Sequence, residues 1–300
     1  MSNGAASRAE WLALARRAET LGYAILVVPD HFRNALATGP ALLAAAEATT
    51  TLRVGSLVFD NDFRHPTILA KEAASLDVLT GGRFEMGLGA GWMRSEYDEA
   101  GIAFDPPGLR VGRLEEAVRI VKGLFADEPL HFAGRYYHVN GLTGLPRPVQ
   151  RPHPPLVIGG GGRRVLSLAA READIVGFAP RAKVDGSGLD RADITAAAVD
   201  QKVVWVREAA GDRFASLELN LLVQAVSVTD ERAPAIDKLA RRFEATPDVV
   251  ESSPFVFVGS VDWISETLRE RRERYGISYW VVFEVAMEAF APVVARLRGT

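Results

Sequence analysis

The strongest constraint on the fold of this chain is a recurrence of about 30 residues in its first third. Apolar runs that suit buried strands begin near residues 24, 54 and 84, and a stretch with helical spacing separates each from the next. The run 24–28 is continuously apolar, which is typical of a parallel strand covered on both faces. One βα unit takes roughly 30 residues. The recurrence therefore predicts a parallel α/β fold.

The alternation of strands and helices continues to the end of the chain. Further strands are expected near residues 156, 174, 217 and 279, which makes seven in all. Two segments break the alternation. Residues 126–155 should hold a short hairpin and an extended crossing segment, and residues 229–258 should hold an extra helix and a loop. A βα barrel of this length commonly forms one domain. We therefore expect a single domain over residues 1–300, with insertions at about 126–155 and 229–258.

The first residues do not match a complete barrel. Ser7 and Glu10 have the spacing of a capping box, so a helix is expected to follow Ser7 directly. The six residues up to Ala6 include Asn3 and Gly4 and make a poor strand. A closed (β/α)8 barrel needs eight strands. We therefore expect a first strand that is missing or truncated, which would leave two sheet edges unpaired.

The composition argues against several classes of protein. A formal charge of −3 with scattered Arg and Lys gives no surface for a nucleic acid. Zero cysteines exclude disulfides and thiolate catalysis, and suit a cytoplasmic protein. No apolar run approaches the roughly 20 residues that span a bilayer, and residues 1–4 do not resemble a signal peptide. No histidine or carboxylate cluster indicates a metal site.

Polar side chains and glycines follow three of the predicted strands. Asp30 and His31 come after the first, residues 60–62 (Asp-Asn-Asp) after the second, and residues 89–91 (Gly-Ala-Gly) after the third. Parallel βα folds place their chemistry at this end of the strands. His31 could transfer a proton near neutral pH, or it could be a partly buried structural histidine beside a helix-capping Asp30. Asn and Asp at residues 61 and 62 could bind a ligand or close a turn.

A second glycine-rich segment follows the strand predicted near residue 156. Gly159, Gly160, Gly161 and Gly162 precede a predicted helix, and Arg163 follows them. Such a loop offers backbone N–H groups and the positive end of a helix to a phosphate. The alternative is a tight βα turn without a ligand.

Several motifs together resemble the bacterial luciferase-like superfamily, with the closest similarity to actinobacterial deazaflavin-dependent (coenzyme F420) oxidoreductases. They are Arg64-His65-Pro66, Leu76-Asp77, Gly82-Arg83, Gly87 to Trp92, the Pro29-Asp30-His31 strand tip and the Leu156 to Gly162 loop. The resemblance implies a TIM (β/α)8-type barrel that binds a flavin or deazaflavin at its carboxyl-end mouth. It also implies a homodimer, and a non-proline cis peptide near residues 58–60.

The resemblance also assigns roles to individual residues. His31 would lie beside the cofactor ring and act in catalysis with Asp30. Residues that would bind the cofactor are Phe59, Asn61, Asp62, Gly89, Ala90, Gly91, Gly159, Gly160, Gly161, Gly162 and Arg163. Some deazaflavin enzymes carry a glutamate near the position of Ala90, and an alanine cannot take over its proton transfer.

The expected function is that of an oxidoreductase in which reduced F420 gives a hydride to a small organic substrate. An FMN-dependent monooxygenase of the same superfamily is the alternative. A flavin-binding or structural barrel without catalysis is the alternative from another class. A TIM-barrel hydrolase has no support, because no paired carboxylates follow the predicted strands.

Overall fold

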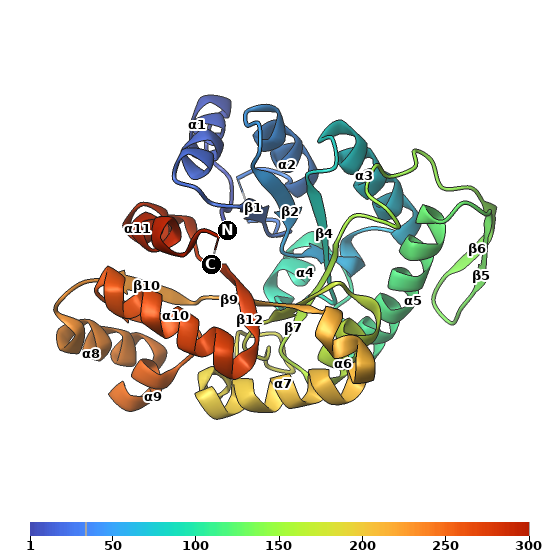
Figure 1. The fold of residues 1–300 in the computed structure, drawn as a ribbon. Coiled ribbons are helices and arrows are strands. Elements are labelled where there is room, and N and C mark those ends of the chain that lie inside the picture. Colours follow the sequence, from blue (N-terminus) through green and yellow to red (C-terminus); the bar gives the residue numbers. More distant parts are fainter. Residues whose placement is uncertain (34, 300) are drawn as a thin grey trace.

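The computed structural model describes residues 1–33 and 35–299, and a curled parallel sheet lies at its centre with helices around it (Figure 1). In sheet order the strands are β1 (Ile25–Val28), β2 (Arg53–Ser56), β4 (Phe84–Gly89), β7 (Leu156–Gly160), β8 (Ile175–Phe178), β9 (Glu218–Leu222) and β12 (Ile277–Val281). Every neighbouring pair is parallel. The short strand β3 (Phe59–Asp60) joins the carboxyl end of β4. The parallel α/β prediction and its seven strands are confirmed.

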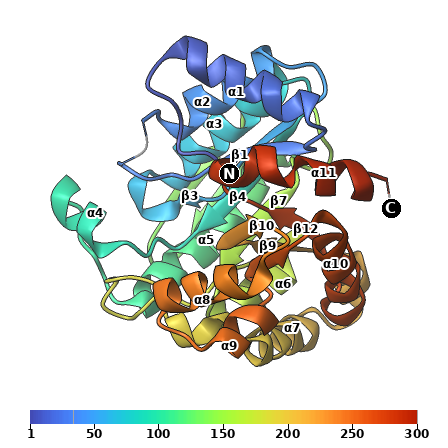
Figure 2. The ribbon, with the colours of Figure 1, turned by 90° about the vertical axis from the view of Figure 1, so that its left-hand side faces the viewer.

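Helices cover the outside of the sheet and bury its apolar side chains between the two layers. They are α1 (Arg8–Thr20), α2 (Thr38–Glu47), α3 (Pro66–Leu79), α5 (Pro107–Phe125), α6 (Arg163–Glu172), α7 (Ala196–Ala210), α10 (Val261–Tyr275) and α11 (Met287–Leu297), whereas the short helix α4 (Arg94–Ala100) follows β4 and does not cover the sheet. Their starts follow the sequence: the Ser7 hydroxyl accepts the Glu10 N–H, and Pro66 occupies the first turn of α3. Figure 2 shows α4 standing out at one end of the barrel.

Both insertions exist, and the second differs from its prediction. Residues 126–155 hold the expected antiparallel hairpin, β5 (Leu130–Ala133) and β6 (His138–Leu142). The second contains α8 (Arg232–Phe243) and α9 (Pro247–Ser252) inside a parallel pair, β10 (Ala225–Val228) and β11 (Val256–Gly259). The single strand expected over 217–228 is wrong. Val223 still donates to Val281 of the barrel, whereas Gln224 donates to Phe255, so the chain changes sheets there.

The sequence places Glu85 and Glu284 within predicted strands, where each would be a structural residue that needs a partner such as Arg53 or Arg83. Glu85 lies in β4 with Arg53 as its partner, 2.8 Å away, as expected. Glu284 does not lie in a strand, because β12 ends at Val281 and Glu284 begins the 3-10 turn η4 (Glu284–Ala286).

The edge strands β1 and β12 do not pair with each other, and the first two residues lie between them. The Met1 nitrogen donates to the Val282 carbonyl, the Glu284 N–H donates to the Met1 carbonyl, and the Ser2 N–H donates to the Val27 carbonyl. The Met1 bonds have the spacing of a parallel ladder. Within the described residues α1 is the first regular element, in line with the sequence-based expectation.

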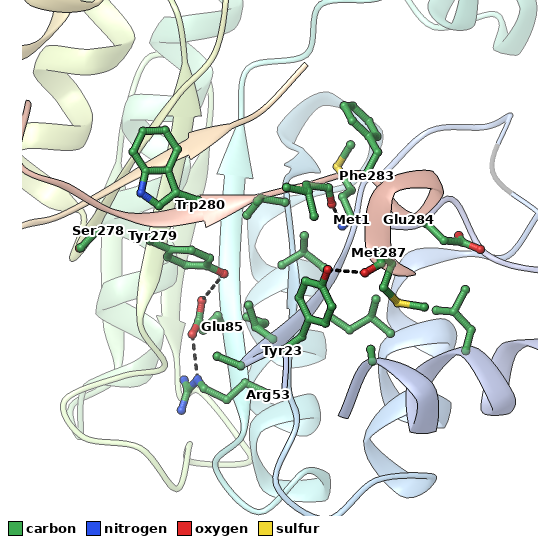
Figure 3. A pocket seen from close by; sticks show the side chains of 18 of the residues that line it. Met1, Tyr23, Arg53, Glu85, Ser278, Tyr279, Trp280, Phe283, Glu284 and Met287 are labelled. Carbon is green, nitrogen blue, oxygen red and sulfur yellow. Dashed lines mark hydrogen bonds and ion pairs between the residues drawn. The ribbon is translucent and has the colours of Figure 1, made fainter. Parts of the chain in front are cut away.

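Beside this seam lies a cavity of about 310 Å³ between β1 and β12 (Figure 3). The Tyr279 hydroxyl lies 3.2 Å from Glu85, whose other oxygen bonds Arg53. Burial, the largest effect, raises the pKa of Tyr279 and that of Glu218 nearby. These groups lie at the amino ends of β2, β4, β9 and β12, the end of a βα barrel that serves stability.

Val58 fills the centre of the sheet at the opposite, carboxyl end. The non-proline cis peptide expected near residues 58–60 is present at Leu57–Val58. A Cβ added to Gly89 would lie 2.5 Å from a Val58 methyl carbon, and one on Gly159 3.4 Å from the other. The glycines of β4 and β7 therefore let the Val58 side chain sit between the strands.

The close approach of β2 and β4 gives a prediction. A Cβ on Gly87 would lie 2.1 Å from the Ser56 carbonyl oxygen, so Gly87→Ala should lower the free energy of unfolding by about 1–3 kcal/mol or more. Gly108→Ala is the control: its Cβ would meet nothing nearer than 3.9 Å, and alanine favours the helix by about 0.5–1 kcal/mol. Urea denaturation of both variants tests this, and equal stabilities would contradict the packing.

Candidate functional site at the carboxyl ends of the strands

His31 follows β1 and is held by a buried carboxylate that the sequence analysis did not identify. Its Nδ1 lies 2.6 Å from Oε2 of Glu96 on α4, and the Glu96 side chain is only 2% exposed. The other Glu96 oxygen accepts the backbone N–H of Arg33 at 3.3 Å. The edge of Trp92 packs against the His31 ring, with centroids 6.0 Å apart. The imidazole is thus fixed in position with its side chain 27% exposed.

Asp30 connects the ends of β1 and β3. One of its oxygens accepts the Thr38 hydroxyl at 3.1 Å, and the other accepts the Asp60 N–H at 3.1 Å. The Arg64 guanidinium forms an ion pair with the Asp30 carboxylate at 2.9 Å. Asp30 thus contacts the backbone and side chains around the mouth of the barrel. The carboxylate beside the His31 ring is that of Glu96.

Asp60 lies buried beneath the glycines that follow β4. The Tyr97 hydroxyl is 2.9 Å from each Asp60 oxygen, and a Cβ on Gly91 would overlap both groups. Burial, the largest effect, raises the pKa of Asp60 to about 7, and the nearby Asp62 adds to it. Burial also raises the pKa of Tyr97. Asp60 is therefore an acid that changes its charge near neutral pH.

The three neighbouring residues predicted to bind a cofactor have different surroundings. Phe59 is fully buried and stacks under the Arg64 guanidinium at 4.9 Å. Asp62 forms an ion pair with Arg113 at 2.8 Å, and this bond raises the pKa of Arg113. Asn61 is 1% exposed and donates to the Tyr137 hydroxyl at 3.3 Å. A pocket of about 370 Å³ is lined by Asn61, Asp62 and the loop at 102–105.

The second glycine loop opens α6, as predicted. Gly162 is the N-cap of α6, and a Cβ there would meet nothing within 4 Å. Gly161 packs on the backbone of Arg181, where a Cβ would come within 2.5 Å. Arg163, expected to bind phosphate, instead pairs with Glu208 on α7 at 3.4 Å, with a side chain 68% exposed. The loop therefore presents backbone groups, and Arg163 points to an exposed partner.

The loop after β8 reaches across to the β4 side. The Arg94 N–H donates to the Gly186 carbonyl, and a Cβ on Gly186 would clash with Phe104 and with the Trp92 carbonyl. The base of this loop is anchored by Asp193, which pairs with the fully buried Lys202. Burial lowers the pKa of Lys202. The sequence of residues 181–190 is polar and contains glycines, which predicts a mobile loop. In the structure this loop is tied at one point to the segment that carries Glu96.

Two buried side-chain atoms in the described ranges lack a hydrogen-bond partner, and both belong to this end of the barrel. They are the acceptor Oδ1 of Asn61 and the donor Nη1 of Arg64. Unpaired buried polar atoms are costly and call for a partner. A flavin or deazaflavin ring carries donors and acceptors along one edge, so the residues present fit such a group.

The residues that sequence reasoning missed lie mainly on α4 and α5. Glu96 and Tyr97 follow Trp92 by one helical turn, and Arg110 on α5 donates to the carbonyls of Ala90 and Gly91. The sequence signal that could have identified Glu96 is a carboxylate a few residues after the glycine-rich end of a predicted strand. Among residues 1–33 and 35–299 there is no cluster of metal-binding side chains, and none of the helices there has the length and apolar composition needed to cross a membrane.

Comparison with known proteins places this site in a family context. A family model described as luciferase-like monooxygenase matches residues 1–276. The FMNH2-dependent dimethylsulfone monooxygenase of Pseudomonas putida is 32% identical over 145 residues, 48% of this chain and 39% of that protein. The F420-dependent glucose-6-phosphate dehydrogenase of Kineococcus radiotolerans is 32% identical over 166 residues, 53% of this chain and 48% of that protein. The matches thus span about half or less of these relatives.

Solved structures show the same fold. An F420-dependent secondary alcohol dehydrogenase in complex with an F420–acetone adduct superposes with a TM-score of 0.77 at 18% identity, covering 99% of this chain and 97% of that one. A long-chain alkane monooxygenase gives 0.77 at 16% identity, covering 97% and 84%. The curled sheet is thus that of luciferase-like TIM barrels.

The raised pKa of Asp60 predicts how stability depends on pH. Its pKa is about 7 in the folded protein against an ordinary 3.8, so the unfolded chain loses the proton first as pH rises. The free energy of unfolding should therefore fall by up to about 1.4 kcal/mol per pH unit between these values. Asp60→Asn removes this contribution and keeps the side-chain shape.

The measurement is urea denaturation of wild type and Asp60→Asn from pH 4 to pH 8. The stability of wild type relative to the variant should decrease up to about pH 7 and then level off. If the difference in unfolding free energy between wild type and Asp60→Asn does not change with pH, the raised pKa of Asp60 is contradicted.

Proposed function

Because the chain belongs to the luciferase-like monooxygenase family, we propose that it is an oxidoreductase that binds a flavin-type ring at the carboxyl ends of β1, β3, β4 and β7. The observation that carries the proposal is His31: Glu96 holds one ring nitrogen, and the other has no partner among the described residues. This nitrogen lies at the carboxyl ends of the strands, the end where the glycines of β4 and β7 make room for the Val58 side chain.

Coenzyme F420 is the cofactor we propose, with FMN as the alternative. The preference rests only on the overall resemblance to actinobacterial deazaflavin-dependent oxidoreductases, while relatives named for F420 and for FMNH2 both match this chain. The choice determines the reaction. A bound reduced deazaflavin supplies a hydride to a carbonyl, imine or activated double bond, whereas reduced FMN supports monooxygenation.

His31 would deliver or take the proton that accompanies the redox step. In the proposed reduction its protonated Nε2 gives a proton to the substrate atom that gains negative charge, and general acid catalysis of this kind is worth about 10²–10⁴-fold. Asp30 would serve this step by fixing the strand tip that carries His31, through its bonds to Asp60 and Arg64.

The remaining candidate residues would bind the cofactor. Asn61 Oδ1 and Arg64 Nη1 can pair with the polar edge of the ring, and the backbone of residues 89–91 would contact the ring beside them. Residues 159–162 offer N–H groups at the start of α6 to a phosphate. Arg163 would join them by leaving Glu208, a change of small cost for an exposed ion pair.

Cofactor binding is the first prediction from this proposal. Titration of the purified protein with F420 and with FMN, followed by fluorescence, should give a micromolar or lower Kd for at least one, and F420 is expected to bind more tightly. Failure of both to bind would overturn the proposal, and tighter binding of FMN would favour the monooxygenase alternative.

Substitution of His31 is the second prediction. His31→Ala should lower kcat by about 10²-fold or more and change the cofactor Kd little, because His31 acts on a proton and the ring is held elsewhere. His65→Ala is a control, since His65 caps α3 through Thr67 on the surface. Equal losses of binding and turnover in His31→Ala would indicate a structural histidine, and a protein that binds cofactor without turnover would favour the non-catalytic alternative.

A further inference from the structure

We propose that Glu96 is a positioning residue that fixes the proton of neutral His31 on Nδ1 and so leaves Nε2 free to exchange a proton with a bound molecule. This inference deepens the proposed function and rests on it for its catalytic consequence. Its structural part, the protonation pattern of the His31 ring, holds for the protein without any ligand.

The geometry around Glu96 leaves little freedom for either side chain. Oε2 of Glu96 is 2.6 Å from Nδ1 of His31, and Oε1 accepts the Arg33 N–H. A carboxylate only accepts hydrogen bonds, so the proton of this short contact belongs to Nδ1. The neutral ring therefore carries Nδ1–H, and its lone pair is on Nε2.

Burial makes this arrangement effective. Glu96 is 1% exposed, so water does not compete for its oxygens. When Nε2 gains a proton, the imidazolium faces a carboxylate in a poorly solvated position, where opposite charges attract more strongly than in water. The Trp92 ring lies perpendicular to the His31 ring, with centroids 6.0 Å apart. Glu96 would thus hold the ring in one orientation and support both of its charge states.

Glu96→Gln gives a sharp test, because the Arg33 N–H restricts how glutamine can bind. That N–H requires an acceptor, so the amide oxygen of the glutamine should face Arg33 and its NH2 group should face His31. An NH2 group donates, so Nδ1 must then accept and the ring proton must move to Nε2. The substitution should therefore reverse the tautomer of His31 with little change in shape.

Glu99→Gln is the matched control. Glu99 lies on the same helix, three residues further, and pairs with the Arg33 side chain at 2.6 Å, both side chains being 61% exposed. The chemical change is identical and the helix is the same, but Glu99 is exposed and bonds the Arg33 side chain in place of His31. This variant should leave the tautomer and the turnover of the protein unchanged.

The experiment is long-range ¹H–¹⁵N correlation NMR of the ligand-free protein, with the His31 signals assigned by their loss in His31→Gln. Wild type and Glu99→Gln should show Nδ1 protonated and Nε2 bare, and Glu96→Gln the reverse. A wild-type ring protonated on Nε2 would overturn the proposal, and so would an unchanged tautomer in Glu96→Gln. If Glu96→Gln does not fold, the wild-type spectrum still decides the tautomer.

Kinetics test the consequence for catalysis. With the cofactor that binds, Glu96→Gln should lower kcat by about 10²-fold or more with little change in KM, and should have no further effect in the His31→Gln background, because Glu96 acts through His31. An equal loss in both backgrounds would assign Glu96 to the fold of α4. If no cofactor binds, the proposed function fails, while the NMR result stands separately.

Discussion

The site depends first on Asp30, a nearly buried carboxylate that ties the ends of two strands together. It accepts the backbone N–H of Asp60 and the side chains of Thr38 and Arg64. Through these bonds β1, β3 and the start of α2 keep one relative position. His31 and Asn61 follow the two strands that Asp30 ties together. The Asp30 carboxylate therefore sets the distance between His31, the proposed proton donor, and Oδ1 of Asn61.

The two ends of the barrel use buried polar groups differently. At the amino ends, Arg53, Glu85 and Tyr279 satisfy one another beside the cavity at the seam (Figure 3). At the carboxyl ends, Asn61 and Arg64 each keep a buried atom that has no partner among residues 1–33 and 35–299, and Asp60 holds a proton up to neutral pH. A satisfied network stabilises the fold, whereas unsatisfied atoms are expected where a ligand binds.

Local patterns predicted the strands well because the barrel strands carry short apolar stretches between clear helix signals. The Ser7 cap and Pro66 marked two helix starts correctly. Tertiary contacts decided what the sequence could not: β10 leaves the barrel because Gln224 pairs with Phe255. Glu96 was missed for the same reason, since a seven-residue helix has too few turns for periodicity and its contact with His31 spans 65 residues.

The central claim is that a flavin-type ring binds at the carboxyl ends of β1, β3, β4 and β7. A crystal structure of the protein with F420, and in parallel with FMN, tests it most directly. We predict that the ring lies at this end of the barrel, with its polar edge within hydrogen-bond distance of Asn61 Oδ1 or Arg64 Nη1 and with Nε2 of His31 facing the reacting side. A ring bound in the cavity between β1 and β12, or away from His31, would contradict it.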